Sequence, residues 1–221
     1  MRTRTGTRSI ALLLAVVMAA VCLAGCSDNF KSKKVAELAK DYGMRELTRE
    51  EFDWRWQGGW NDPEMMEVFD KMLNAPAYYA AKDGAEADQI YDKYFKLDTN
   101  DVPGLEEFIE CEDRNNGFDI FLMTCSTKES AERLYNEWAK YWGEDEDTTG
   151  YTGTKSGCTY TILHYEMVGD TGRYGTRYFG MYLKGNVFIY IDTVVTEKYN
   201  HDCLDHFCKK LGLVSPIEPK K

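Results

Sequence analysis

Residues 105–125, LEEFIECEDRNNGFDIFLMTC, determine the expected fold of this chain. Two runs of strand-forming residues, 105–113 and 118–125, flank Asn116-Gly117, and that dipeptide is the strongest short-range signal for a β-hairpin. Apolar residues occupy both alternating sets of positions in the second run. Because successive strand residues point to opposite faces, we predict that this strand is buried on both sides.

The residues after the hairpin predict a helix that begins at Ser126 or Thr127 and runs through Trp142. Its core face should consist of four residues at helical spacing, Ala131, Leu134, Tyr135 and Trp138. The acidic segment 143–157 that follows is rich in Gly and Thr and is expected to be a loop.

Further along the chain the pattern predicts three strands and a last helix. The strands are expected at 158–166, 176–183 and 187–195, and Gly185-Asn186 forms a second tight hairpin between the last two. The helix runs from about 199 to 211 and stops at Gly212.

The N-terminal half has a different, mostly helical pattern. Thr48-Arg49-Glu50-Glu51 matches a capping box at the start of a short helix. Other helices are expected at 30–42, after Asp62-Pro63, and at 85–97. We therefore predict one α+β domain over 30–215, in which helices from 30–97 pack with an antiparallel sheet of about five strands, in ββαβββα order, over 105–213.

The first 26 residues form a three-part signal. Arg2, Arg4 and Arg8 precede an apolar run over 10–21, and Leu23-Ala24-Gly25-Cys26 follows it. This stretch resembles a bacterial lipoprotein signal peptide with its lipobox. The resemblance implies that residues 1–25 are removed, that the Cys26 thiol carries lipid such as palmitate-type acyl chains, and that the protein is anchored on the extracytoplasmic face of the cell membrane.

Two other interpretations of this segment are open. One is ordinary secretory cleavage near Ala24, which would leave Cys26 without lipid. The other is an uncleaved anchor helix, but the apolar run is well short of the ~20 residues that span a bilayer. Residues 26–29 would form a short tether, which would hold the domain close to the membrane.

The net charge limits the partners. Once residues 1–25 are removed, 24 Lys and Arg stand against 37 Asp and Glu, a net charge of −13. Nucleic-acid binding needs a basic surface, so we expect no nucleic-acid partner. For the same reason the domain would not bind anionic lipid by its own charge, and membrane attachment would depend on Cys26.

A second resemblance covers scattered segments. Asn186-Val187-Phe188-Ile189-Tyr190-Ile191, Lys209-Lys210-Leu211-Gly212 and Ala39-Lys40-Asp41-Tyr42-Gly43 are similar to parts of small uncharacterised lipoproteins from Gram-positive gut bacteria. That group has no known activity, so the resemblance implies architecture and location alone.

The mature chain would keep five cysteines, Cys111, Cys125, Cys158, Cys203 and Cys208. An odd number leaves at least one thiol outside any intramolecular disulfide. We expect buried thiols rather than a full disulfide framework, although export permits disulfides.

A candidate metal site lies in the last helix. His201, Asp205 and Cys208 are spaced i, i+4, i+7 and would share one helix face. The alternative is that Cys208 belongs to an apolar core stripe with Leu204 and Phe207. The chain contains no CxxC or HExxH motif to support the metal.

A candidate contact surface is the cluster of tryptophans near residue 55. Phe52 and Trp56 are four residues apart and would both face the core, which leaves Trp54 and Trp60 to contact a glycan or a protein partner. Ordinary packing of all these rings is the alternative.

The sequence contains no GxSxG or SxxK motif, and its three histidines have no recognisable catalytic partner. We therefore expect no catalytic residues and no cofactor, and a membrane-anchored protein that binds a cell-envelope protein. The alternatives are a glycan- or peptidoglycan-binding lipoprotein that uses Trp54 and Trp60, or a metal-binding enzyme that uses His201, Asp205 and Cys208.

Overall fold

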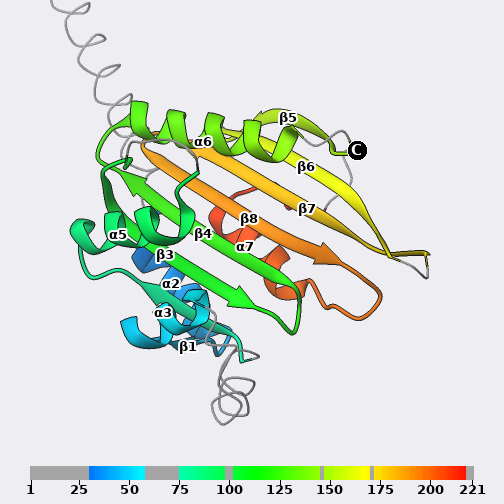
Figure 1. The fold of residues 1–221 in the computed structure, drawn as a ribbon, viewed down its shortest axis with the longest axis horizontal. Coiled ribbons are helices and arrows are strands. Elements are labelled where there is room, and N and C mark those ends of the chain that lie inside the picture. Colours follow the sequence, from blue (N-terminus) through cyan, green and yellow to red (C-terminus); the bar gives the residue numbers. More distant parts are fainter. Residues whose placement is uncertain (1–29, 58–74, 98–101, 145–146, 170–171, 218–221) are drawn as a thin grey trace, which may run out of the picture.

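A mixed, mostly antiparallel sheet with helices on both faces forms the centre of the computed structural model (Figure 1). The structure describes residues 30–57, 75–97, 102–144, 147–169 and 172–217. Within these ranges the sheet has eight strands in the order β1-β2-β3-β4-β8-β7-β6-β5, and only β1 and β2 are parallel. The strands are β1 Arg45–Glu46, β2 Ala77–Ala80, β3 Leu105–Asp113, β4 Phe118–Cys125, β5 Thr149–Lys155, β6 Cys158–Gly169, β7 Gly172–Lys184 and β8 Val187–Val195.

Five helices of the described residues cover the two faces of this sheet. Their bounds are α2 Ser32–Asp41, α3 Arg49–Gln57, α5 Gly84–Ile90, α6 Lys128–Gly143 and α7 Asp202–Leu211, and a π-helical turn η1, Tyr91–Phe95, continues α5. The helices α2 and α7 pack on one face, whereas α3, α5 and α6 pack on the other (Figure 1). We call the second one the α6 face.

Side-chain caps start the helices where the sequence predicts them. At α3, Thr48 Oγ1 accepts from the N–H of Glu51 at 3.3 Å, and Glu51 Oε2 accepts from the N–H of Thr48 at 2.8 Å. Thr127 caps α6 by accepting from the N–H of Ser130 at 3.1 Å. Each cap satisfies backbone donors that the first helical turn leaves unpaired, so the capping box is confirmed.

The hairpin between β3 and β4 has the predicted strands but a longer turn. Asp113 pairs with Phe118, so the turn contains all of residues 114–117 and not Asn116-Gly117 alone. Asp113 Oδ1 accepts from the backbone N–H groups of Asn115 at 3.1 Å and Asn116 at 3.2 Å. This Asp side chain favours the wider turn, because it satisfies two donors that a two-residue turn would not present.

The connection through α6 sets the strand order. It leads from β4 in the middle of the sheet to β5 at the edge, and the chain then returns through β6 and β7 to β8. As a result β8 lies between β4 and β7, and it pairs antiparallel with both.

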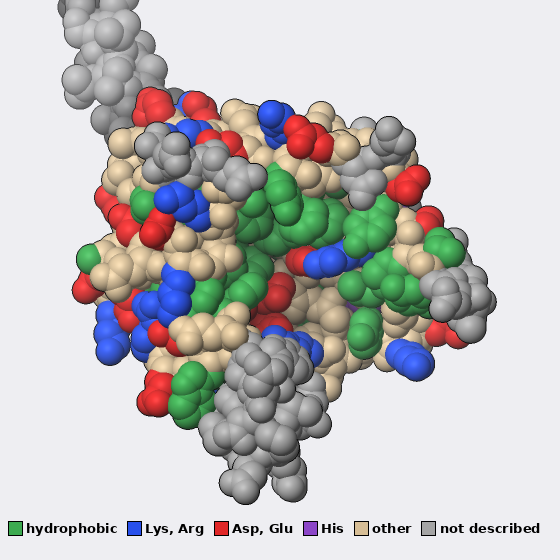
Figure 2. All heavy atoms as spheres, viewed as in Figure 1, with side chains coloured by type: hydrophobic (Ala, Val, Ile, Leu, Met, Phe, Trp, Pro, Cys, Tyr) green, Lys and Arg blue, Asp and Glu red, His purple; other side chains and the backbone are tan. Residues whose placement is uncertain are grey.

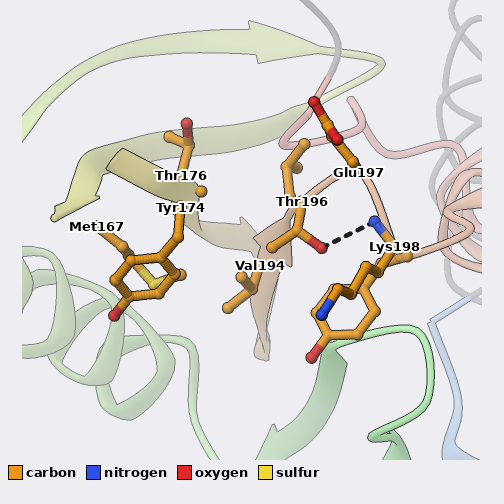
Figure 3. Close-up of a pocket in the computed structure, with 10 residues that line it drawn as sticks. Met167, Tyr174, Thr176, Val194, Thr196, Glu197 and Lys198 are labelled. Atoms are coloured by element: carbon orange, nitrogen blue, oxygen red, sulfur yellow. Dashed lines mark hydrogen bonds between the residues drawn. The ribbon is translucent and has the colours of Figure 1, made fainter. Parts of the chain in front are cut away.

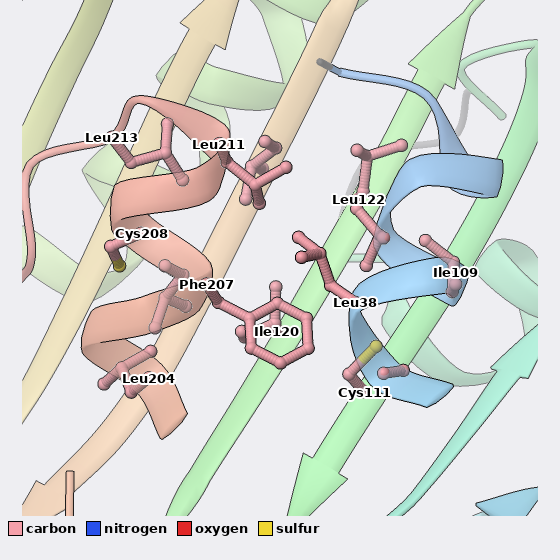
Figure 4. Close-up of a cluster of buried hydrophobic side chains, with 14 of the residues drawn as sticks. Leu38, Ile109, Cys111, Ile120, Leu122, Leu204, Phe207, Cys208, Leu211 and Leu213 are labelled. Atoms are coloured by element: carbon pink, nitrogen blue, oxygen red, sulfur yellow. The ribbon is translucent and has the colours of Figure 1, made fainter. Parts of the chain in front are cut away.

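The middle strands are buried on both faces, as predicted for 118–125. Ile120 and Leu122 belong to a core against α2 and α7, together with Leu38, Leu204, Phe207 and Leu211 (Figure 4). Phe121 and Met123 belong to a second core on the α6 face, where they join Leu134 and Trp138. All four residues of the predicted core face of α6 are buried.

The α+β class is confirmed, but the expected sheet of about five strands is wrong. The strands β1 and β2 come from the half expected to be helical, and β5 comes from the expected loop over 143–157. The sequence of β2, AYYA, is short and buried, and β5 is a mostly exposed edge strand rich in Thr and Gly. Neither gives a periodic signal, because pairing with β3 and β6 creates these strands.

None of the five cysteines Cys111, Cys125, Cys158, Cys203 and Cys208 takes part in a disulfide in the structure, and all except Cys203 are buried. Burial raises the pKa of Cys125 to about 12 and that of Cys158 to about 11. These thiols remain protonated at neutral pH, as expected for core cysteines that are not reactive.

Several predicted features lie outside the described residues: the signal and Cys26, the helix after Asp62-Pro63, and Trp60. In the ranges that the structure describes, no helix combines the length and apolar character needed to cross a membrane.

The two cores make a prediction about β4. Ile120→Ala and Met123→Ala, on opposite faces, should each lower the free energy of unfolding by about 2–5 kcal/mol, because each leaves a cavity in a packed core. The exposed Thr154→Ala should change it by less than ~0.5 kcal/mol. Urea unfolding of the three variants measures this, and a large loss at only one of the two β4 positions would contradict the two-sided burial.

Candidate functional site

Four carboxylates gather on the α6 face, and we call them the acidic cluster: Glu110 and Glu112 of β3, Asp119 of β4 and Asp192 of β8. Strand pairing forces them together. Glu112 is directly opposite Asp119, and Asp119 is directly opposite Asp192 on the next strand. Like charges in register across a sheet are destabilising, so this arrangement needs compensation.

Burial makes the repulsion stronger. Glu110 is only 3% exposed and Glu112 only 6%, whereas Asp119 and Asp192 are half-buried. A charge removed from water is costly unless a partner of opposite charge or a set of hydrogen bonds stabilises it.

The helix α3 provides part of this compensation. Phe52, fully buried, stacks on Tyr79 with 4.5 Å between ring centroids and fixes the helix on the sheet. Arg55 and Trp56 lie three and four residues further on, so they share the face that Phe52 buries. Arg55 Nη1 lies 3.1 Å from Glu112 Oε2, and Trp56 Nε1 donates to Glu110 Oε2 at 2.9 Å.

Two other arginines complete the ion pairs. Arg114, from the β3–β4 turn, donates to the second oxygen of Glu112. Arg177, from β7, binds both oxygens of Asp192, at 2.9 Å and 2.5 Å. Glu112 and Asp192 therefore have both oxygens paired with guanidinium groups.

The remaining two carboxylates, Glu110 and Asp119, are not fully paired. Within the described part of the chain, Oε1 of Glu110 and Oδ1 of Asp119 are buried and have no hydrogen-bond partner. Native proteins rarely leave buried acceptors unpaired, and these two atoms are the carboxylate oxygens in that state among the described residues.

The surroundings of Glu110 and Asp119 favour the protonated forms of both carboxyl groups. Burial, and then the negative charge of Glu112, raise the pKa of Glu110 to about 8. Burial, and then Glu110 and Glu112, raise the pKa of Asp119 well above its ordinary value. At neutral pH the cluster therefore holds at least one proton when no other cation neutralises it.

Aromatic rings surround the acidic cluster. Phe121 lies 6.1 Å from Trp56, 5.0 Å from Phe95 and 5.8 Å from Tyr190, measured between ring centroids. On the other side, the Arg177 guanidinium lies 5.2 Å from the centroid of the Phe179 ring. These rings exclude water and lower the local dielectric constant, which strengthens every charge interaction in the cluster.

The acidic cluster opens into a hollow of about 300 Å³, which we call the polar hollow. Figure 2 shows acidic side chains at the bottom of a depression in the middle of this face, between hydrophobic side chains. The lining of the polar hollow includes three carboxylates and two guanidinium groups, from Glu112, Asp119, Asp192, Arg114 and Arg177, together with Val194 and Tyr199.

A larger groove, of about 880 Å³, lies at the end of β6, β7 and β8. It shares Val194 and Tyr199 with the polar hollow. Met167, Tyr174 and Thr176 form one side, and the segment from Thr196 to Lys198 forms the other, held by a 3.2 Å hydrogen bond between the N–H of Lys198 and Thr196 Oγ1 (Figure 3). Its lining contains a single carboxylate and a single ammonium group, so it offers less chemistry than the acidic cluster.

No protein-family model, curated protein or solved structure matches this chain. A function for the site can therefore be inferred only from its own chemistry.

The described residues contain one group of at least three Asp, Glu, Cys or His side chains whose possible metal-ligand atoms all lie within 4.8 Å of one another. This group is Glu110, Glu112 and Asp119. The predicted metal ligands are not in this group. Cys208 is buried in the core under α7, and Asp205 accepts from Ser215 Oγ at 2.8 Å. Burial lowers the pKa of His201. The site at His201, Asp205 and Cys208 stays a prediction without support from this geometry.

Trp54 is 36% exposed on α3, and Trp56 is 37% exposed although its ring also rests on Phe95. The sequence predicts Trp56 in the core and Trp54 on the surface, but the two rings are about equally exposed. Trp60 lies outside the described residues, so its pairing with Trp54 stays a prediction.

Sequence reasoning missed the acidic cluster, although the sequence contained a sign of it. Asp119 interrupts an apolar set in a strand predicted to be buried on both faces, and Glu110 and Glu112 alternate with buried residues in the paired strand. Asp192 and Arg177 gave no such sign, because the order of β4, β8 and β7 was not predictable.

The raised pKa of Glu110 predicts an unusual dependence of stability on pH. Below pH 4.5, the ordinary pKa that Glu110 has in the unfolded chain, this residue is protonated in both the folded and the unfolded state. As the pH rises from there through about 8, the pKa in the folded state, the stability contributed by the protonated form is lost. Glu110→Gln keeps an acceptor for Trp56 but removes the charge, so it should be more stable than the wild type at pH 9 and similar at pH 5. Each unit of pKa difference corresponds to about 1.4 kcal/mol.

Urea unfolding at pH 5, 7 and 9 measures this effect. Glu106→Gln, on the same strand but exposed, is the matched control and should follow the wild type at all three pH values. A wild-type stability that changes with pH in the same way as that of Glu110→Gln would show that Glu110 is not the group responsible.

Proposed function

We propose that this protein is a lipoprotein held on the extracytoplasmic face of the cell membrane by lipid on Cys26, and that it binds a ligand or partner at the polar hollow. The lipobox supports the location, and the acidic cluster supports the binding role. One observation carries the binding role: Asp119, a carboxylate with an unpaired oxygen, lines an open hollow next to the buried and incompletely paired Glu110.

This arrangement lowers the stability of the folded protein, because apolar residues at the same positions would pack without charge repulsion. Features that break the rules of stable packing are concentrated at functional sites. A bound group that supplies the missing hydrogen bonds and charge would offset this loss.

The geometry favours binding over catalysis. A general acid or base must come within about 3 Å of the reacting atom. The unpaired Oε1 of Glu110 has almost no accessible surface and Glu110 is 3% exposed, whereas Asp119 is half-buried and lines the hollow. A carboxylate held in this way acts on a ligand through its charge rather than by transferring a proton to it.

The membrane attachment predicts the behaviour of two cysteine variants. Cys26→Ala should release the protein from membranes and abolish incorporation of labelled palmitate, because a stable anchor requires the acyl chains on this thiol. Cys22→Ala, in the same signal, should leave both unchanged. Cell fractionation with palmitate labelling measures this, and full membrane retention of Cys26→Ala would refute the anchor.

A glycan-binding lipoprotein is the second candidate, favoured by the exposed rings of Trp54 and Trp56 on α3. Under this hypothesis Trp54→Ala and Trp60→Ala should each reduce retention on purified cell-wall material several-fold, because each removes a stacking surface. Tyr141→Ala, which removes another exposed ring, is the control. Equal retention of all variants would exclude a glycan site at these tryptophans.

A further inference from the structure

The charges of the acidic cluster do not balance. Its four carboxylates, from Glu110, Glu112, Asp119 and Asp192, face the three guanidinium groups of Arg55, Arg114 and Arg177. The fully ionised site therefore has one excess negative charge. The lining of the polar hollow gives the same result, with three carboxylates and two guanidinium groups. A single positive charge would neutralise the site.

The missing charge and the missing hydrogen bonds coincide at Asp119. This residue belongs to the acidic cluster and also lines the polar hollow, and its Oδ1 finds no partner among the described residues. The neighbouring Glu110 is 97% buried, and its Oε1 also has no hydrogen-bond partner among the described residues. A ligand in the polar hollow would thus contact the Asp119 carboxylate directly and interact electrostatically with the Glu110 carboxylate.

We propose that the polar hollow binds a small primary alkylammonium ion, with Asp119 as the main contact and Glu110 as the supporting charge. This inference rests on the proposed binding function of the hollow. An ammonium group supplies one positive charge and three N–H donors without an acceptor, which suits the Asp119 carboxylate because the three guanidinium groups of the cluster pair with Glu112 and Asp192 instead. Charge-assisted hydrogen bonds of this type are among the stronger ones in proteins.

A divalent metal ion fits less well, although Glu110, Glu112 and Asp119 are close enough to surround one. Both oxygens of Glu112 are already bound by Arg55 and Arg114. Two charges would leave the site with a net positive charge next to those guanidinium groups. A quaternary ammonium ion has the right charge but no N–H group for the carboxylate oxygens.

The dimensions of the polar hollow favour a short alkyl chain. Its volume of about 300 Å³ is at the lower end of the range for small-molecule pockets. Val194 and Tyr199 provide apolar surface in the lining, and the ring of Tyr199 lies beside Gly117. This surface suits the methylene groups of a small amine.

Isothermal titration of the full lipid-attached chain in nonionic detergent tests the proposal, with n-butylammonium, tetramethylammonium and Ca²⁺ as the probes. We expect n-butylammonium to bind saturably and more tightly than the other two. Asp119→Asn should weaken it by at least about tenfold, because a charge-assisted hydrogen bond is lost. Asp202→Asn, an exposed carboxylate on α7, should bind like the wild type.

A thermal melt of each variant confirms that it is folded before titration. The ammonium proposal is overturned if n-butylammonium does not bind, if it binds Asp119→Asn as well as wild type, or if tetramethylammonium or Ca²⁺ binds at least as tightly. If Ca²⁺ binds more tightly than n-butylammonium and Asp119→Asn abolishes that binding, the hollow is a binding site for another class of ligand. If no probe binds, the proposed binding function at this hollow fails as well.

Discussion

Burial of β3, β4 and β8 on both faces is the constraint on which the rest of this structure depends. Two separate cores, one against α2 and α7 and one against α3, α5 and α6, cover the same strands. Side chains in the middle of these strands are therefore placed among apolar neighbours, whatever their charge. Carboxylates at such positions repel one another more strongly and bind their partners more tightly than they would in water.

The acidic cluster follows directly from this constraint. Antiparallel pairing places Glu112, Asp119 and Asp192 in one row across three strands. Guanidinium groups from α3, the β3–β4 turn and β7 neutralise part of the row, and aromatic rings surround it. The same elements that stabilise the fold therefore also determine the charge and shape of the polar hollow.

The candidate site required residues from regions far apart in the sequence. Arg55 and Trp56 reach it because Phe52 fixes α3 on the sheet, and Arg177 reaches it because β7 pairs with β8. By contrast, the predicted ligands His201, Asp205 and Cys208 are close in sequence, but their helix turns Cys208 into the core. Local spacing alone does not distinguish a ligand face of a helix from a packing face.

The sequence by itself determined the α+β class, the limits of β3 and β4, the capping box of α3 and the buried face of α6, because each depends on residues within a few positions of one another. It also contains Leu23-Ala24-Gly25-Cys26, the stretch on which the proposed lipid anchor is based. Only the tertiary structure decided the strand order, the three additional strands β1, β2 and β5, and the meeting of four carboxylates with three arginines. These features depend on pairing between distant strands, and a pairing partner is not encoded in the local pattern of either strand.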